Sequence, residues 1–202
     1  LLREHHILCL QPASIGGKMG GPNGRVGLGP MRRLGIRMQI GVISDTHDHH
    51  RNVRRAIEIF DEEAVRYVLH AGDITSASTI DLLAGLQPAR LIAVFGNCDV
   101  DRRSLGTAVE TIGGEVHSGS YQGRIDDRTI YMAHKPHAVG AAISGGTYDL
   151  VIYGHTHRQD VRRSDRTLVV NPGAATNWMG LPGHVVILDT ADMTTTIRRL
   201  DA

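Results

Sequence analysis

Seven side chains that can bind a divalent metal follow apolar segments of this chain, each near the end of a segment that is typical of a buried strand. They are two aspartates, four histidines and one asparagine: Asp45, His47, Asp73, Asn97, His134, His155 and His157. Carboxylate, imidazole and amide groups together suit borderline divalent metals such as Mn, Fe, Zn, Ni or Co. Seven groups are too many for one tetrahedral ion, so they favour two ions that share a bridging carboxylate, an arrangement that suits in-line displacement at phosphorus.

Two pairs of these ligand candidates are separated by a single residue. They are Asp45-Thr46-His47 and His155-Thr156-His157. Residues i and i+2 of an extended chain point to the same side, so we expect both members of each pair to reach the same ion pair.

The first half of the chain alternates between strand and helix patterns. Apolar runs predict buried strands over residues 39–44, 66–70 and 90–95, and the apolar spacing of residues 50–63 predicts a helix. Ser76 is expected to cap a second helix that ends near residue 84. This alternation indicates a sheet covered by helices, and sites in such sheets form outside the carboxyl ends of the strands.

The second half of the chain is richer in strands than in helices. We predict a strand pair, residues 116–121 and 129–134, joined across Asp126-Asp127. A short helix is expected over residues 138–144. Further strands are expected over residues 149–153, 161–163, 167–170, 184–188 and 194–200.

Residues 1–37 differ from the rest of the chain in composition and pattern. Residues 15–30 are Gly-rich and have neither a strand nor a helix period. We interpret residues 1–37 as a disordered or non-native extension, with a targeting peptide as the alternative. Met38 would be a natural start, and residues 38–202 are expected to form one domain.

Charge and composition exclude several classes of function. Residues 1–37 hold six of the 22 Lys and Arg and one of the 21 Asp and Glu, which leaves 16 and 20 in residues 38–202, a net charge of −4. This acidic body argues against a nucleic-acid polymer as partner. No apolar run approaches the roughly 20 residues of a membrane helix. The two cysteines, Cys9 and Cys98, give no disulfide framework and favour a cytoplasmic protein.

The ligand candidates lie within motifs that resemble those of the calcineurin-like metallophosphoesterases, in the same order and at similar spacing. The motifs are Asp45-Thr46-His47, Gly72-Asp73, Gly96-Asn97-Cys98-Asp99, His134 and Gly154-His155-Thr156-His157. The chain is most similar to the small, single-domain YfcE-like branch, from Met38 to the C-terminus. The resemblance implies an α/β (α+β) fold, a two-sheet β-sandwich flanked by helices in four αββα layers. It also implies a metal-dependent phosphodiesterase or phosphatase that acts on a small phosphate ester.

The resemblance further implies two ions with Asp73 as the shared ligand and a metal-bridging hydroxide as the nucleophile. One ion would take Asp45, His47, Asp73 and His157, and the other Asp73, Asn97, His134 and His155. Mn is the expected metal, with Ni, Co, Fe, Zn and Mg as alternatives. His134 departs from the Gly-His arrangement of the family, so His137 is a rival ligand. Lys135 and His137 are alternative contacts for the phosphate.

Asn97, Cys98 and Asp99 form the predicted catalytic segment. The wider family usually has a histidine after the asparagine, which contacts the phosphate and can protonate the leaving group, whereas the small branch often has cysteine. A thiol is mostly neutral at pH 7 and is a weak hydrogen-bond donor, so we expect good leaving groups to be hydrolysed best. We interpret Cys98 as a thiol that lines the site, in preference to a ligand or a covalent nucleophile. Asp99 is expected to orient its loop.

A protein-interaction scaffold of the same fold, similar to the non-catalytic subunit of retromer coats, is the competing interpretation. Such scaffolds typically lack some ligands, and the presence of all seven favours an enzyme. Trp178, which follows the turn Asn171-Pro172-Gly173, is expected to pack its loop, with stacking on a nucleobase or aryl group as the alternative. The substrate and the oligomeric state stay open, a homo-oligomer included.

Overall fold

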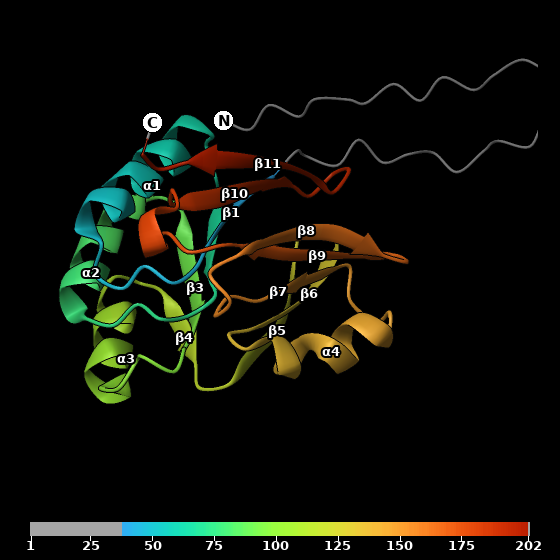
Figure 1. Cartoon of the computed structure of the whole chain (residues 1–202), viewed down its shortest axis with the longest axis horizontal. Helices are drawn as coiled ribbons and strands as arrows, with labels where there is room; N and C mark the ends of the chain where they lie inside the picture. The colour runs from blue at the N-terminus through green and yellow to red at the C-terminus, as the bar shows by residue number, and fades with distance from the viewer. Residues whose placement is uncertain (1–37, 202) are drawn as a thin grey trace, which may run out of the picture. The chain divides into compact units, whose positions relative to one another are not determined.

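The computed structural model describes residues 38–201, which form two β-sheets and the helices that cover them (Figure 1). The predicted N-terminal extension, residues 1–37, lies outside the described residues. Among residues 38–201, no helix is both long enough and apolar enough to cross a membrane.

The first sheet has six strands in the order β11-β10-β1-β2-β3-β4. Strands β1 to β4 run parallel to one another, β10 is antiparallel to β1, and β11 at the edge is antiparallel to β10. The parallel arrangement brings the carboxyl ends of β1, β2 and β3 to one edge. The strands are β1 (Gln39–Ile43), β2 (Tyr67–His70), β3 (Arg90–Val94), β4 (Glu115–His117), β10 (His184–Asp189) and β11 (Thr194–Arg199).

Three helices cover the outer face of this sheet: α1 (His50–Glu62), α2 (Ala77–Leu83) and α3 (Arg102–Thr111), with the short 3-10 turn η1 (Ala84–Leu86) after α2. Their apolar residues pack with Ile43 and Val68 of the sheet in one buried cluster. The helix lies close to the sheet at Gly41 in β1, where an added Cβ would overlap the ring of Phe60 in α1. A glycine at this position therefore lets α1 lie directly against a central strand.

The second sheet has five strands in the order β5-β6-β7-β9-β8, and helix α4 (Pro136–Ser144) packs on its outer face. Strands β6, β7 and β9 are parallel, and β5 and β8 are antiparallel edge strands. The strands are β5 (Ser120–Ile125), β6 (Arg128–Ala133), β7 (Leu150–Ile152), β8 (Gln159–Ser164) and β9 (Thr167–Pro172).

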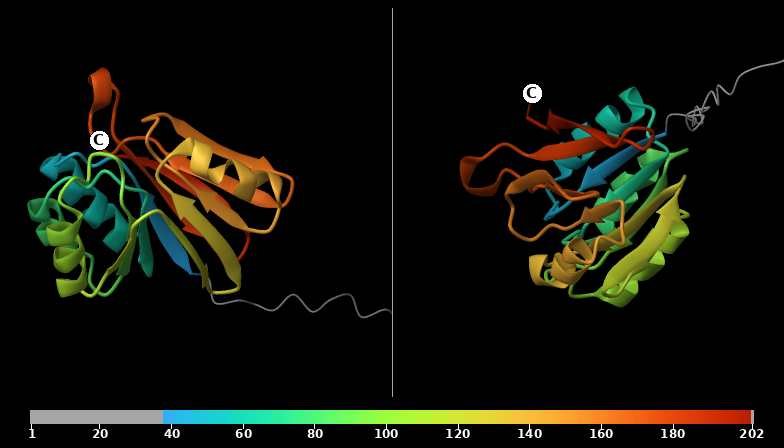
Figure 2. Two further views of the ribbon diagram at one scale, coloured as in Figure 1. Left: turned by 90° about the horizontal axis from the view of Figure 1, so that it is seen from below. Right: turned by 90° about the vertical axis from the view of Figure 1, so that its right-hand side faces the viewer.

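The inner faces of the two sheets bury a common apolar layer. Ile40, Leu69 and Ile92 of the first sheet belong to the same buried cluster as Met132 and Ile152 of the second. The helices lie outside, so the layers run helix, sheet, sheet, helix (Figure 2). The predicted four-layer sandwich is confirmed.

Two details of the predicted elements are wrong. The expected strand over residues 116–121 is two strands, because the chain leaves the first sheet after His117 and enters the second at Ser120. The dipeptide Ser118-Gly119 between the two strands is typical of turns, and the strand prediction ran through it. Ser76 does precede α2, but its hydroxyl donates to Asp48 and makes no cap hydrogen bond. Helix α3, with only Leu105 and Val109 fully buried, was not predicted.

Candidate metal centre

The seven ligand candidates come together where strands of both sheets end. Asp45 and His47 follow β1, Asp73 follows β2 and Asn97 follows β3, while His134 follows β6 and the pair His155 and His157 follows β7. Each of the seven has a potential ligand atom within 3.9 Å of that of another member of the set, so they form one continuous cluster.

One end of the cluster consists of Asp45, His47 and His157. Asp45 Oδ1 lies 3.2 Å from His157 Nε2 and 3.9 Å from His47 Nε2, and the two Nε2 atoms are 3.3 Å apart. Two atoms bound about 2.1 Å from one ion would lie about 3.4 Å apart in a tetrahedral site. The observed separations are therefore those of three ligands around a common centre.

Asp73 joins this group to the other end of the cluster. Its Oδ2 lies 3.6 Å from His47 Nε2 and 3.4 Å from His134 Nε2. His134 Nε2 in turn lies 3.1 Å from Asn97 Oδ1 and 3.3 Å from His155 Nδ1. Asp73 thus stands between the two groups, where a bridging carboxylate would have to be.

His134, and not its rival His137, reaches the cluster. The His134 ring is buried, and its Nδ1 lies 2.8 Å from the carbonyl oxygen of Ala71. A carbonyl can only accept, so the proton is on Nδ1 and the lone pair of Nε2 faces the other ligands. His137 lies exposed in the first turn of α4 and belongs to none of the groups that could hold an ion.

Each carboxylate accepts its shortest hydrogen bonds from the protein through one oxygen, and its other oxygen faces the imidazoles, although Asp45 Oδ1 also accepts weakly from the His155 N–H at 3.3 Å. Asp45 Oδ2 accepts from Ser44 Oγ at 2.6 Å and from the N–H of His155 at 3.0 Å. Asp73 Oδ1 accepts from the N–H of Cys98 at 2.8 Å. The hydrogen-bonded oxygens fix the two side chains, so the oxygens that face the imidazoles need little reorganisation to bind a cation.

The surroundings favour the ionised form of Asp73. Burial acts to raise the pKa of its carboxyl group, but the neighbouring His134 side chain and a hydrogen bond from the Cys98 backbone outweigh burial and hold this pKa well below the usual range. Burial, followed by the charges of His134 and Lys135, lowers the pKa of His155 and favours its neutral form. An anionic carboxylate and a neutral imidazole are the protonation states that bind metals.

Five of the seven residues have left-handed backbone conformations, which corrects the extended-chain explanation of the Asp-X-His and His-X-His spacing. Such conformations cost non-glycine residues about 1–3 kcal/mol each and concentrate at functional sites. Backbone hydrogen bonds between the loops stabilise them, from Asp45 N–H to the Gly72 carbonyl at 2.9 Å, for example. The positive φ angles are 53° at Asp45, 40° at His47, 58° at Asp73, 69° at His155 and 57° at His157.

Asp99 contacts backbone rather than the cluster. Its side chain is buried and accepts from the N–H groups of Gly96 at 2.6 Å, Thr75 at 2.8 Å and Asp73 at 3.0 Å. This carboxylate therefore ties the loop after β3 to the loop after β2 and fixes the backbone of Asp73. The geometry matches the expectation that Asp99 orients its loop, and it makes Asp99 a positioning residue.

Cys98 lies at the exposed side of the cluster. Asn97 Nδ2 donates to its Sγ at 3.3 Å, and the thiol lies within reach of an ion held by His47 and Asp73. Burial, and then the charge of Asp73, raises the pKa of the thiol, which favours its protonated form. A protonated thiol is a poor ligand and a poor nucleophile.

Sequence reasoning missed two side chains that hold the site loops. Arg102 donates to the carbonyl oxygens of Gly96 at 3.2 Å and Asp99 at 3.3 Å. Asn171, at the Asn-Pro-Gly turn, donates to the Gly154 carbonyl at 3.1 Å and to Thr156 Oγ1 at 3.0 Å, and so braces the His155–His157 loop. The Asn-Pro-Gly turn was a usable signal, whereas nothing in the sequence marked Arg102.

Trp178 packs against the cluster from the 3-10 turn η2 (Trp178–Gly180). The edge-to-face contact with the His157 ring has a centroid distance of 4.3 Å and an interplanar angle of 88°. The indole is 48% exposed. It therefore covers one ligand, as expected of a loop-packing residue, while one part of the ring stays open to solvent.

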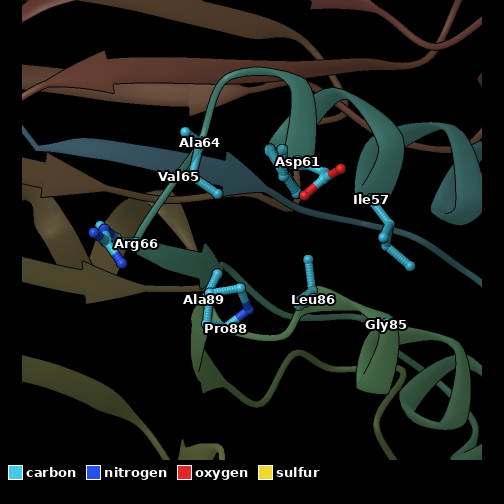
Figure 3. Close-up of a pocket in the computed structure, with 10 residues that line it drawn as sticks. Ile57, Asp61, Ala64, Val65, Arg66, Gly85, Leu86, Pro88 and Ala89 are labelled. Atoms are coloured by element: carbon cyan, nitrogen blue, oxygen red, sulfur yellow. The ribbon is translucent and has the colours of Figure 1, made fainter.

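A cavity of ≈ 290 Å³ elsewhere in the fold takes no part in this centre (Figure 3). Residues from the end of α1, from η1 and from the start of β2 and β3 line it, among them Ile57, Asp61, Arg66 and Leu86. It therefore lies at the amino ends of β2 and β3, whereas the ligand candidates lie at the carboxyl ends. None of the seven ligand candidates lines it.

We predict that Asp99→Asn weakens metal binding although Asp99 is no ligand. An amide cannot accept from Gly96, Asp73 and Thr75 together, because its NH₂ group must face an N–H. We expect a loss of about 1–3 kcal/mol in the free energy of unfolding and a roughly 10–100-fold loss of metal affinity. Calorimetric metal titration and urea unfolding would measure both.

Asp101→Asn is the matched control, because exposed Asp101 caps α3 through the Ser104 N–H and asparagine caps equally well. Wild-type metal affinity in Asp99→Asn would contradict the assignment.

We also predict that metal-stripped protein loses stability in mild acid through His70. Its ring is buried between Thr46 and Gly72, and burial lowers its pKa to about 4, against 6.5 for the ordinary side chain. The unfolded chain therefore binds a proton that the folded chain does not between these values. This contribution to stability is complete above pH 6.5 and declines as the pH falls toward 4. Urea midpoints from pH 7 to 4 should fall more for wild type than for His70→Asn; parallel curves would refute the prediction.

Comparison with known proteins agrees with this geometry. The family model described as the calcineurin-like phosphoesterase superfamily domain matches residues 38–193. A phosphodiesterase from Methanocaldococcus jannaschii is 41% identical over 157 residues, which cover 76% of this chain and 93% of the relative.

Solved structures of phosphoesterases also resemble this chain. A structure described as an archaeal phosphodiesterase superposes with a TM-score of 0.76 at 36% identity and covers 80% of this chain and 99% of that one. The phosphoesterase YfcE from E. coli superposes with a TM-score of 0.60 at 18% identity, over 81% of this chain and 100% of its own, and shares the fold. This chain belongs to the calcineurin-like phosphoesterase superfamily and is a metal-dependent phosphoester hydrolase.

Proposed function

We propose that this chain is a phosphodiesterase that hydrolyses small phosphate esters with two divalent ions. The observation that carries the proposal is the position of Asp73, whose free oxygen lies 3.6 Å from His47 Nε2 on one side and 3.4 Å from His134 Nε2 on the other. A carboxylate between two imidazole groups is suited to bridge two cations. The diester preference is supported by the relative that is 41% identical, which is named a phosphodiesterase.

The donor set fits two ions. Asp45, His47, Asp73 and His157 would hold the first, and Asp73, Asn97, His134 and His155 the second. Mn is the metal we expect, with Ni, Co, Fe, Zn and Mg as alternatives, because mixed carboxylate and imidazole sites suit these cations. When bound, such ions would supply hydroxide at neutral pH and neutralise the phosphate oxygens.

The residues at the open side of the cluster would contact the substrate and determine whether its leaving group is protonated. Asn97 and Cys98 are exposed at the open side of the cluster, where a leaving group can lie. Both are neutral there, since the pKa of the thiol is raised. A neutral site offers no strong acid for the departing oxygen. It therefore favours substrates whose leaving group departs without protonation.

The scaffold interpretation has one observation in its favour. Trp178, Met179 and Leu181 are exposed apolar residues in one loop beside the cluster, and exposed apolar groups of this kind can bind a protein. A scaffold would not need the ordered ligands, however. The complete ligand set, the ionised Asp73 and the fixed His134 tautomer all favour hydrolysis.

We predict metal-restored hydrolysis of bis-p-nitrophenyl phosphate, faster than that of p-nitrophenyl phosphate. Metal-stripped protein would be assayed with Mn, Ni, Co, Zn or Mg added singly. Asp73→Asn should lower kcat/KM by at least about 100-fold and reduce bound metal from two ions to one or none, because it weakens a ligand of both ions.

Asp61→Asn, an exposed carboxylate on α1, is the control and should behave as wild type. Normal turnover in Asp73→Asn would remove the two-ion proposal. Absence of turnover with every metal, despite two bound ions, would favour the scaffold.

We predict that Cys98→His speeds hydrolysis of diesters with poor leaving groups. An imidazolium can donate a proton where the neutral thiol cannot, and such acid catalysis commonly contributes about 10²–10⁴-fold. The ratio of kcat/KM for an alkyl leaving group to that for p-nitrophenolate should rise in Cys98→His and stay unchanged in Cys98→Ser. If histidine and serine have the same effect, Cys98 only packs its loop.

A further inference from the structure

A second cavity adjoins the metal centre, and the proposed hydrolysis gives it no role. It measures ≈ 210 Å³, and two of the ligand candidates, Asn97 and His134, line it together with Arg102, Lys135 and His137. We call it the flanking pocket. Pockets that hold a whole drug-sized ligand measure about 300–1,000 Å³, so this one suits a single substituent of a larger substrate.

The flanking pocket is built from both sheets. Asn97 and Arg102 come from the segment between β3 and α3, and Lys135 and His137 from the start of α4 after β6. Ser118 and Gly119, which carry the chain from one sheet to the other, complete the wall. A group in this pocket would therefore lie next to the ligands of the second ion and away from Asp45 and His157, which do not line it.

The pocket carries positive charge that the described residues do not balance. None of its lining residues is acidic, and within residues 38–201 neither Arg102 nor Lys135 forms an ion pair with a carboxylate. The Arg102 guanidinium donates to three carbonyl oxygens, those of Gly96, Asp99 and Ser118, and lies 5.4 Å from the centroid of the Phe95 ring. These contacts fix its position and leave its charge without a counter-ion.

The side chains that line the flanking pocket favour an anion over a cation. Phe95, buried beneath the guanidinium, gives the pocket an apolar side that disfavours a hydrated cation. Lys135 and His137, at the start of α4, line the same cavity beside the ligand candidate His134. A fixed guanidinium, a lysine and an exposed imidazole around one small cavity form a site for a phosphate group, which accepts several charge-assisted hydrogen bonds.

We propose that the flanking pocket binds a second, terminal phosphate of the substrate. The inference rests on the proposed function and narrows it: the preferred substrates are small diesters that carry an additional phosphate near the scissile one. The scissile phosphate itself must lie at the ligands of both ions. The pocket touches the ligands of only one ion, so its occupant is a further anionic group attached through a short linker.

A pair of matched synthetic diesters tests the proposal. Ethyl p-nitrophenyl phosphate and 2-phosphoethyl p-nitrophenyl phosphate share the leaving group and differ by the terminal phosphate. We expect wild type to show a kcat/KM about tenfold or more higher for the phosphorylated diester, a usual effect of charged hydrogen bonds. Lys135→Gln and Arg102→Gln should bring this ratio close to one.

Arg103→Gln is the matched control. Arg103 is the neighbour of Arg102 on α3 and is exposed, but it does not line the flanking pocket, so the ratio should stay as in wild type. The ratio of two substrates cancels any general loss of folded or metal-loaded enzyme. A wild-type ratio near one, or an unchanged ratio in Lys135→Gln, overturns the proposal and leaves the proposed function intact.

A binding measurement separates failure of the pocket from failure of the proposed function. Inorganic phosphate would be titrated into metal-stripped protein while the amide NMR signals of Gly119 and Ala138, which line the pocket, are followed. Saturable shifts in wild type that are lost in Lys135→Gln support the pocket. Their absence overturns it. Shifts without turnover of either diester would refute the proposed function and leave an anion site on a non-catalytic protein.

Discussion

The candidate metal centre depends on holding two carboxylates and four imidazoles in one cluster, with neighbouring ligand atoms no more than 3.9 Å apart, before any cation is present. Asp99 contributes directly to this, because its buried carboxylate accepts from three backbone N–H groups in two loops, that of Asp73 included. Asp73 has a left-handed backbone, with φ of 58°, which it would abandon without such support. A bridging ligand can serve two ions only if its backbone is fixed.

The two sheets supply the second constraint. Parallel pairing of β1, β2 and β3 brings Asp45, Asp73 and Asn97 to one edge, and parallel pairing of β6 and β7 does the same for His134 and His155. The apolar layer between the sheets then holds both edges together. Glycines allow the loops to approach closely: an added Cβ at Gly96 would overlap the Asp73 carboxylate, and one at Gly154 would overlap Ser44. The glycines of the Gly-Asn and Gly-His motifs thus follow from packing.

The sequence was enough to predict that the seven ligand candidates come together, because each one follows a strongly apolar strand and the ends of such strands can be recognised from the pattern. It failed where structure depends on distant partners. The dipeptide Ser118-Gly119 permits a turn between β4 and β5, but only pairing with two different sheets makes them separate strands. The i, i+2 spacing correctly predicted that the members of each pair lie in one cluster, but the expected extended backbone was wrong. Both members of each pair have a left-handed backbone conformation. The role of Arg102 could not be predicted from the sequence, because its side chain binds carbonyl oxygens that come together only in the folded loops.

The neutral side chain of Cys98 and the positive charge of the flanking pocket together determine where a substrate would meet positive charge. An imidazolium at position 98 would attract the phosphate of any ester and protonate many leaving groups. With a protonated thiol there, the cations beside the ligand candidates Asn97 and His134 are Arg102 and Lys135, which would lie to one side of a phosphate bound at both proposed ions. Positive charge at that position cannot assist a leaving group directly, but it discriminates strongly between substrates that carry a second phosphate and those that do not. Under the proposed function, this arrangement would lack broad acid catalysis and would instead bind one class of small, activated diester selectively.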